Sequence, residues 1–160
     1  FEKLILKFRK HFLKIILNLF PPLFFNRIVV KNISDDYLEM DVVLKKTFFN
    51  INFHKTIFGG SIFSACDPFF PTMYYNIFKL QDRKLIIWVK NAEINYLLPA
   101  NTSLKLKFQI NNSHLSEIEK NLQTNGKCEI KNEVEAKNKN NEICASAIIT
   151  TYLRDSNFMN

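Results

Sequence analysis

Glycine, cysteine and histidine are scarce in this chain, which has three of each among its 160 residues. The cysteines, Cys66, Cys128 and Cys144, are odd in number and lack any CxxC spacing, so the sequence indicates neither a disulfide framework nor a zinc site. The histidines stand far apart and form no metal-ligand pair, so the sequence implies no metal ion. This cysteine content favours a reducing, intracellular location.

Long apolar runs and flexible linkers are also missing. No stretch of about 18 uncharged apolar residues occurs, and basic residues interrupt positions 1–20, so we expect neither a transmembrane helix nor a secretory signal. No segment rich in Gly, Ser and Pro divides the chain, which therefore reads as one domain. We expect a protein of the cytoplasm, or of an organelle lumen if an upstream targeting segment precedes Phe1.

Positive charge is what the chain has in excess, with a net charge of +7 and a sequence pI near 9.3. Such a balance favours nucleic acid, anionic lipid or a polyphosphorylated ligand such as coenzyme A. The lysines are scattered, however, and no helix-turn-helix, zinc-finger or RNA-platform motif is legible, so we do not expect a nucleic-acid partner.

Residues 3–19 have the pattern of an amphipathic helix that ends before Pro21-Pro22. Two interpretations are open. The helix either packs over the edge of the domain, or residues 1–20 contact anionic lipid as a basic interfacial helix. Its predicted apolar face consists of Leu4, Phe8, Phe12, Ile15, Ile16 and Leu19.

Alternation of apolar and polar residues predicts six strands, at 24–34, 37–46, 84–97, 102–110, 127–137 and 142–153. Between them, residues 60–79 form a helical run that is apolar nearly all round, with a break expected near 64–68 because of Pro68 and Pro71. A second helix is predicted at 114–125, capped by Asn112 or Ser113 and ended by Gly126. Lys90 and Glu93 are expected to pair.

This order of elements predicts an α+β fold in which a curved antiparallel sheet wraps around the long helix. A single sheet of this kind leaves its edges short of cover. Pairing of two chains edge to edge would solve that problem, so we expect a dimer.

Gly59-Gly60 at the start of the apolar helix, followed by Asp67, is the most informative segment. A helix start offers unpaired N–H groups to an electron-rich oxygen, and paired glycines let a ligand approach closely. Asp67 lies about 12 Å further along the helix, too far to share one small atom with Gly59. The glycines could instead serve close helix-to-sheet packing, Asp67 could cap a restarted helix, and Cys66 reads as a core residue.

The chain resembles hot-dog-fold proteins over most of its length. Asn52, Gly59-Gly60 and Asp67 are similar to the Asn, His-Gly-Gly and Asp of phenylacetyl-CoA-type acyl-CoA thioesterases. The closer resemblance is to a hot-dog family usually described as a domain of unknown function. It rests on Phe-Gly-Gly-Ser-x-Phe-x-x-x-Asp-Pro-Phe at 58–69, Ile-Trp-Val-Lys-Asn-Ala-Glu-Ile at 87–94 with Leu98-Pro99, and Tyr-Leu-Arg at 152–154.

The resemblance implies an N-terminal helix at 1–22, a hot-dog domain at 23–155 and a tail at 156–160. It implies a homodimer or a dimer of dimers that binds acyl-CoA or an acyl-carrier protein in a site at the subunit interface. No cofactor other than acyl-CoA as substrate or ligand is implied.

The resemblance also implies roles for single residues. The N–H of Gly59 or Gly60 would polarise the thioester carbonyl, and Asp67 of the other subunit would be the base or nucleophile. Asn52 would orient the water, unless it is only a turn residue. Phe58, Phe63, His54 and Trp88 would line the substrate pocket.

One departure from the thioesterase pattern opens a second function. Phe58 stands where those enzymes have His, and a phenyl ring can neither titrate nor donate a hydrogen bond. His54 could substitute for it. The alternative to a thioesterase is therefore an acyl-CoA or fatty-acyl binding protein without catalysis.

Overall fold

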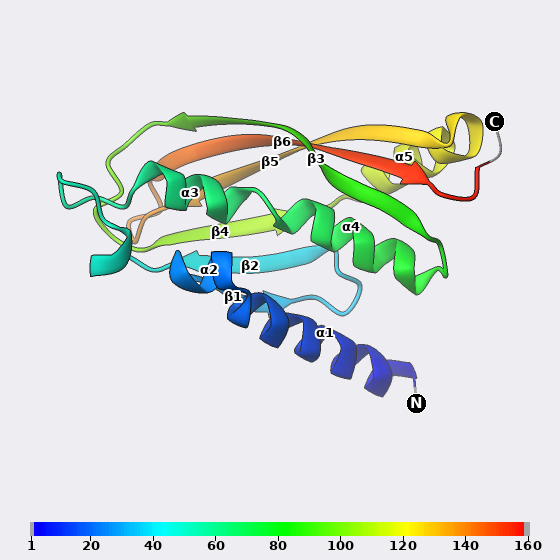
Figure 1. Cartoon of the computed structure of the whole chain (residues 1–160), viewed down its shortest axis with the longest axis horizontal. Coiled ribbons are helices and arrows are strands. Elements are labelled where there is room, and N and C mark those ends of the chain that lie inside the picture. Colours follow the sequence, from blue (N-terminus) through cyan, green and yellow to red (C-terminus); the bar gives the residue numbers. More distant parts are fainter. Residues whose placement is uncertain (1, 159–160) are drawn as a thin grey trace.

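The computed structural model describes residues 2–158, and their side chains from residue 8 onward (Figure 1). Its helices are α1 Glu2–Leu19, α2 Pro21–Phe25, the 3-10 helix η1 Phe48–Asn50, α3 Gly59–Cys66, α4 Phe69–Leu80 and α5 Asn112–Asn125. Its strands are β1 Ile28–Ile33, β2 Glu39–Leu44, β3 Leu85–Tyr96, β4 Leu104–Gln109, β5 Lys127–Lys137 and β6 Ile143–Asp155.

The strands form one six-stranded sheet in the order β1-β2-β4-β5-β6-β3, and all neighbouring pairs are antiparallel. Figure 1 shows α3 and α4 crossing one face of this sheet, α1 beside β1 at one edge, and α5 at the end near the C-terminus. The predicted α+β class and antiparallel sheet are confirmed. Five of the six predicted strands are correct to within two residues at each end.

The core lies between the sheet and the helices. In β4, Leu104, Leu106 and Phe108 are buried while the lysines between them are exposed, as period-2 patterning requires. The rings of Phe69 and Phe70, in the first turn of α4, lie 4.9 and 5.1 Å from the ring of Phe108. These aromatic contacts fix the start of α4 on the middle of the sheet.

The expected break in the apolar helix is present, because α3 ends at Cys66 and α4 begins at Phe69. Two other boundaries differ from the predictions. Residues 21–25 are helical rather than part of a strand, since the two prolines occupy the first helical positions, where their missing N–H groups cost nothing. Helix α5 is capped by Asn111, whose side chain accepts from the N–H of His114, and not by Asn112 or Ser113.

Helix α1 covers the β1 edge of the sheet. The Asn18 amide accepts from the N–H of Val30 at 2.7 Å and donates to its carbonyl at 3.2 Å, as a neighbouring strand would. Leu13 and Leu17 face the core, whereas most of the predicted apolar face is exposed. The predicted face was therefore wrong for Phe8, Phe12, Ile15, Ile16 and Leu19, and the Leu4 side chain lies outside the described ones.

Strand β3 forms the other edge, and no described element covers it. It is 12 residues long, and Ile86, Trp88 and Tyr96 along it are each about half exposed. Lys90 pairs with Glu129 on β5, while Glu93 accepts from Asn91, so the predicted Lys90–Glu93 pair was wrong. A long apolar edge of this kind is a ready site for another strand.

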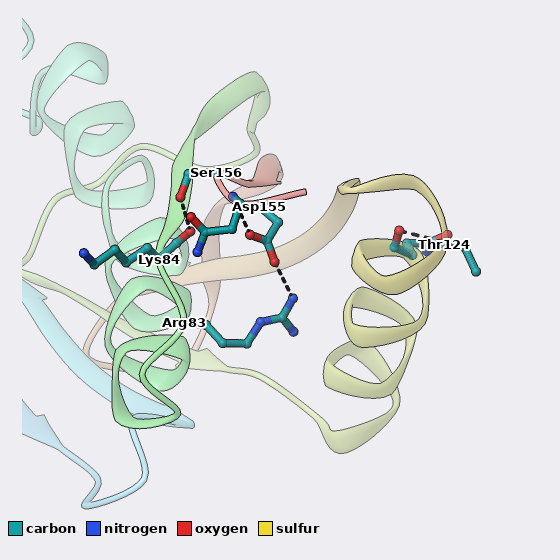
Figure 2. Close-up of polar contacts among 7 residues, drawn as sticks. Arg83, Lys84, Thr124, Asp155 and Ser156 are labelled. Atoms are coloured by element: carbon teal, nitrogen blue, oxygen red, sulfur yellow. Dashed lines mark hydrogen bonds and ion pairs between the residues drawn. The ribbon is translucent and has the colours of Figure 1, made fainter. Parts of the chain in front are cut away.

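Polar contacts join the end of β6 to the turn that leads into β3 (Figure 2). The Arg83 guanidinium lies 2.9 Å from the Asp155 carboxylate, and the Ser156 hydroxyl donates to the Lys84 carbonyl at 2.8 Å. The hydrogen bond from Arg83 holds the pKa of Asp155 below its ordinary value. Nearby on α5, the Thr124 hydroxyl donates to the Lys120 carbonyl within its own helix.

We expect Asp155→Asn to lower the free energy of unfolding by about 1 kcal/mol at neutral pH, because it removes a charged hydrogen bond. A carboxyl with a lowered folded-state pKa stabilises the fold above its unfolded-state pKa, and that stabilisation is lost as pH falls. Urea denaturation at neutral pH and near pH 3 should show a larger difference from wild type at neutral pH than at the acidic pH. Asp82→Asn at an exposed turn is the control; equal losses in both variants would contradict the assignment.

Candidate active site

One face of α3 remains open. Gly59, Phe63 and Asp67 follow at intervals of four residues and so lie along one side of the helix, with Phe63 exposed and the other two partly buried. The opposite side is buried through Ser61, Ile62, Ala65 and Cys66. The glycine start of the helix and the carboxylate thus belong to the same surface strip, which we call the α3 strip.

The first turn of α3 offers two backbone donors. The carbonyl of the N-cap residue Phe58 accepts from the N–H groups of Ser61 and Ile62, at 2.9 and 3.2 Å. Within the described part of the chain, the N–H groups of Gly59 and Gly60 have no acceptor. They are the free donors of a helix start, where the dipole also favours negative charge.

The two glycines serve different needs. A Cβ on Gly59 would lie 3.3 Å from the ring of Tyr96, whose hydroxyl donates to the Gly59 carbonyl at 3.0 Å. Close packing against β3 therefore accounts for Gly59. A Cβ on Gly60 would lie 2.4 Å from the ring of Phe58, so this ring occupies the space beside Gly60. Phe58 is 57% exposed, and a ligand would reach the Gly60 backbone only after the ring has turned toward solvent.

Asp67 is a half-buried carboxylate at the end of α3. Among residues 8–158, whose side chains the structure describes, no hydrogen bond or ion pair reaches the Asp67 side chain, and burial raises its pKa above the ordinary carboxyl value. The predicted alternative, a cap for the restarted helix, was wrong, because α4 has Pro68 as its N-cap and no side-chain cap. An unpaired carboxylate with a raised pKa is suited to accept a proton.

Asn52 and His54 lie on the turn that leads into α3. The Asn52 amide donates to the Thr56 hydroxyl at 2.8 Å, and its oxygen accepts from the N–H groups of His54 and Thr56. The isolated bridge between Ile51 and Ile57 closes this turn. Asn52 is thus used as a turn residue, and the exposed His54 is held there through its backbone.

Trp88 lies apart from the other predicted site residues. It stacks on Tyr152 with the ring centroids 4.4 Å apart, while its neighbour Ile87 packs against the core beneath the helices. Since successive side chains of a strand point to opposite faces, Trp88 lies on the outer face of the sheet. Within one chain, Trp88 is thus separated from the α3 strip by the sheet, and its predicted role in a pocket between subunits stays a prediction.

The remaining titratable candidates do not add a nucleophile or a metal. Cys66 is buried, and burial raises the pKa of its thiol to about 12, so the thiolate is not available at neutral pH. Within residues 2–158, no group of three or more His, Cys, Asp and Glu side chains could hold a metal ion.

A groove that the sequence did not predict runs along α4. It has a volume of about 580 Å³ and lies between α1 and α4, lined by residues that include Phe12, Ile16, Pro71, Thr72 and Tyr75. Pro71 and Tyr75 continue the four-residue spacing of Gly59, Phe63 and Asp67. That spacing was the one feature of the sequence from which the groove could have been predicted. Tyr96 was also missed, because only the fold brings the end of β3 to Gly59.

Residues 9–153 match the family model described as Domain of unknown function (DUF4442). The chain belongs to the DUF4442 family. Among the curated proteins, none matches the chain in sequence. None of the described helices of this DUF4442 protein is both long and apolar enough to cross a membrane.

Solved structures with a similar fold include three bacterial proteins. A Pseudomonas aeruginosa protein of unknown function, described as a probable thioesterase, is 12% identical with a TM-score of 0.77, over 91% of this chain and 95% of that one. The Escherichia coli PaaI protein from the phenylacetic acid degradation operon is 15% identical, with a TM-score of 0.60 over 84% and 85%. A hypothetical thioesterase from Streptococcus pneumoniae, solved with coenzyme A, is 16% identical, with a TM-score of 0.55 over 80% and 86%. The predicted hot-dog fold is thereby confirmed.

We expect Asp67→Asn to raise the free energy of unfolding of the DUF4442 protein at neutral pH, because it removes a charge that burial disfavours. A carboxyl with a raised folded-state pKa binds its proton more tightly when folded, so the wild type loses stability as pH rises through that pKa. The gain in the variant should vanish near pH 3. Urea denaturation checks this, with Asp155→Asn as the comparison of opposite sign; a less stable Asp67→Asn at neutral pH would show a paired carboxylate.

Proposed function

We propose that this protein hydrolyses an acyl thioester, of coenzyme A or of an acyl-carrier protein, in a site between two subunits. The observation that carries the proposal is the α3 strip. It presents the free N–H groups of a helix start and, two turns later, an unpaired half-buried carboxylate. These are the two elements that thioester hydrolysis needs: donors for the oxygen that gains charge, and a base for water.

The geometry of α3 supports a site that is completed by a second subunit. The helical rise separates Gly59 from Asp67 by about 12 Å, so one chain cannot apply both to one carbonyl group. The open edge of β3 supports a partner, because pairing of two such edges would extend the sheet and cover Ile86 and Tyr96. In that dimer the Asp67 carboxylate of one subunit would serve the glycine N–H groups of the other.

The chemistry then follows from ordinary acyl transfer. The Asp67 carboxylate takes a proton from water, the water oxygen bonds to the thioester carbon, and the Gly59 and Gly60 N–H groups stabilise the resulting oxyanion. The C–S bond breaks, and the proton on Asp67 passes to the leaving thiolate. In the nucleophilic variant, the carboxylate itself attacks first. Asn52 contributes as a positioning residue that holds the turn before α3.

The groove along α4 is suited to the acyl chain. It begins one turn after Asp67, and Phe12, Ile16 and Tyr75 give it apolar walls. Phe58 and Phe63 stand exposed at the other end of the strip, where a substrate would enter. The coenzyme A in the Streptococcus pneumoniae structure and the net charge of +7 here support a phosphate-bearing carrier.

Phe58 favours the second candidate, a binding protein without catalysis. Its ring stands against Gly60, where the resembled thioesterases have an imidazole, and it gives the thioester no hydrogen bond. A chain that kept the groove and the dimer could bind acyl-CoA and leave it intact.

We expect the protein to release free thiol from at least one member of a panel of acyl-CoAs of increasing chain length. Asp67→Asn should lower kcat by about 10²–10⁴-fold, the usual contribution of a general base. Thiol release is followed with a chromogenic disulfide reagent, and Asp82→Asn is the matched control. Tight acyl-CoA binding without thiol release, unchanged in Asp67→Asn, would instead establish the binding protein.

Mixed dimers test whether the site is shared. We expect Asp67→Asn and Gly59→Val to be inactive separately. When the two chains are refolded together, half of the dimers carry one site with both groups intact, so activity should return to about a quarter of the wild-type value. Circular dichroism of each variant controls for folding. Absence of any recovery, with mixed dimers demonstrated by two different tags, would contradict a shared site.

A further inference from the structure

Exposed phenylalanines gather at one end of the molecule. They lie on three short segments that are close in sequence, namely α2, η1 and the turn after η1, and Figure 1 shows the chain after β2 extending past α2 to the left end of the molecule. The least exposed of them retains 44% of its surface and Phe53 is fully exposed. We call this group the aromatic tip, and it consists of Phe24, Phe25, Phe48, Phe49 and Phe53.

Arg27 joins two of these segments. Its guanidinium lies 5.7 Å from the ring centre of Phe24 on α2 and 4.6 Å from that of Phe49 on η1. The Arg27 backbone has φ of 63°, an unusual conformation for a residue other than glycine, and its carbonyl accepts from the N–H of Lys45. The aromatic tip is therefore built around a fixed cation rather than a loose loop.

A cavity of about 380 Å³ lies beneath the rings. Its lining includes Asn18, Arg27, Lys45 and Thr47 together with Phe24, Phe48 and Phe49. The Nε of Arg27 is buried and has no hydrogen-bond partner in the described part of the chain. A buried guanidinium N–H without an acceptor is costly, and an anionic oxygen in the cavity would satisfy it.

No carboxylate neutralises this end of the chain. Residues 3–34 and 42–66, which include every segment of the aromatic tip, contain no Asp or Glu, whereas both contain lysines and the first also contains Arg9 and Arg27. Among the described ion pairs, none involves Arg27 or Lys45. The charge thus calls for an anion from outside the chain.

We propose that the aromatic tip docks on the surface of a membrane that contains anionic lipid, with a lipid phosphate in the cavity of Arg27 and Lys45. Projecting apolar rings with cations behind them match the two layers of a bilayer surface, acyl chains inside and charged headgroups outside. The exposed side of α1 is contiguous in sequence through Phe20 and adds apolar surface. The proposed lipid contact is therefore centred on α2 and η1, whereas the sequence placed it at residues 1–20.

A second copy of the chain is a poorer occupant for this surface. The aromatic tip adjoins β1, whereas the open edge that suits a second copy is β3, at the opposite side of the sheet. The proposal is independent of thioester hydrolysis, since it uses neither the α3 strip nor the groove along α4.

The test uses Trp88, the only tryptophan, as an internal reference, because it lies on the outer face of the sheet. Wild type and a Trp88→Phe/Phe53→Trp variant are mixed with phosphatidylcholine vesicles with and without phosphatidylserine. We expect a blue shift and quenching by brominated lipid for the residue placed at 53, only with phosphatidylserine. Trp88 in the wild type should not shift.

Cosedimentation then tests the residues. Phe48→Ser/Phe53→Ser should weaken binding to anionic vesicles about tenfold or more, and Lys45→Gln should weaken it and lower its salt dependence. Ile148→Ser, on the outer sheet face away from both sheet edges, is the control and should bind like wild type. No blue shift at 53, equal binding to neutral vesicles, or loss of dimer mass rather than lipid binding in the Phe variant would each overturn the proposal.

Discussion

The missing N–H of Pro68 is the constraint on which the helical layer depends. A continuous helix from Gly59 to Leu80 would need a backbone hydrogen bond that proline cannot donate. The chain instead stops at Cys66 and starts again at Phe69, where two aromatic rings anchor α4 on Phe108. Asp67 therefore sits between two fixed helices, at the negative end of α3, with no N–H within the described chain to stabilise its charge. Burial at this position raises the pKa of Asp67.

The two edge strands of the sheet differ in whether their backbone groups are covered. At β1 the Asn18 side chain reproduces the hydrogen bonds of a strand at Val30, and the edge is closed. At β3 a strand of 12 residues keeps its outward groups open. Natural sheets usually protect their edges, so β1 follows the usual pattern and β3 departs from it. The β3 strand also carries Tyr96, whose hydroxyl donates to the Gly59 carbonyl, so this edge and the α3 strip are physically connected.

The sequence predicted those features that depend on short-range patterns. Strands β4 and β5 alternate strictly because one face is buried along their whole length, and Gly126 ends α5 with φ of 66°. The helix break could be predicted because proline acts locally. These features needed no knowledge of the neighbours in space.

The predictions that failed depend on tertiary contacts. The face of Trp88 depends on the pairing of β3 with β6, which places it opposite Tyr152. The apolar face of α1 is exposed because Asn18 and Leu17, rather than the larger residues, contact β1 and the core. Asn52 matches a family position, yet only the geometry of the turn shows where its amide is used.

Phenylalanine illustrates why composition alone could not separate packing from function. Of the 16 phenylalanines, some, such as Phe69, Phe70, Phe78 and Phe108, are completely buried and account for the core. Compositional bias alone would scatter the exposed ones over the surface, where single apolar residues need no explanation. The rings of the aromatic tip instead lie on consecutive short segments, and two of them, Phe24 and Phe49, contact one guanidinium, that of Arg27. Exposed apolar clusters lower solubility, so they usually mark an interaction site. Contact with an anionic membrane surface explains both the exposed rings and the unpaired cation beside them.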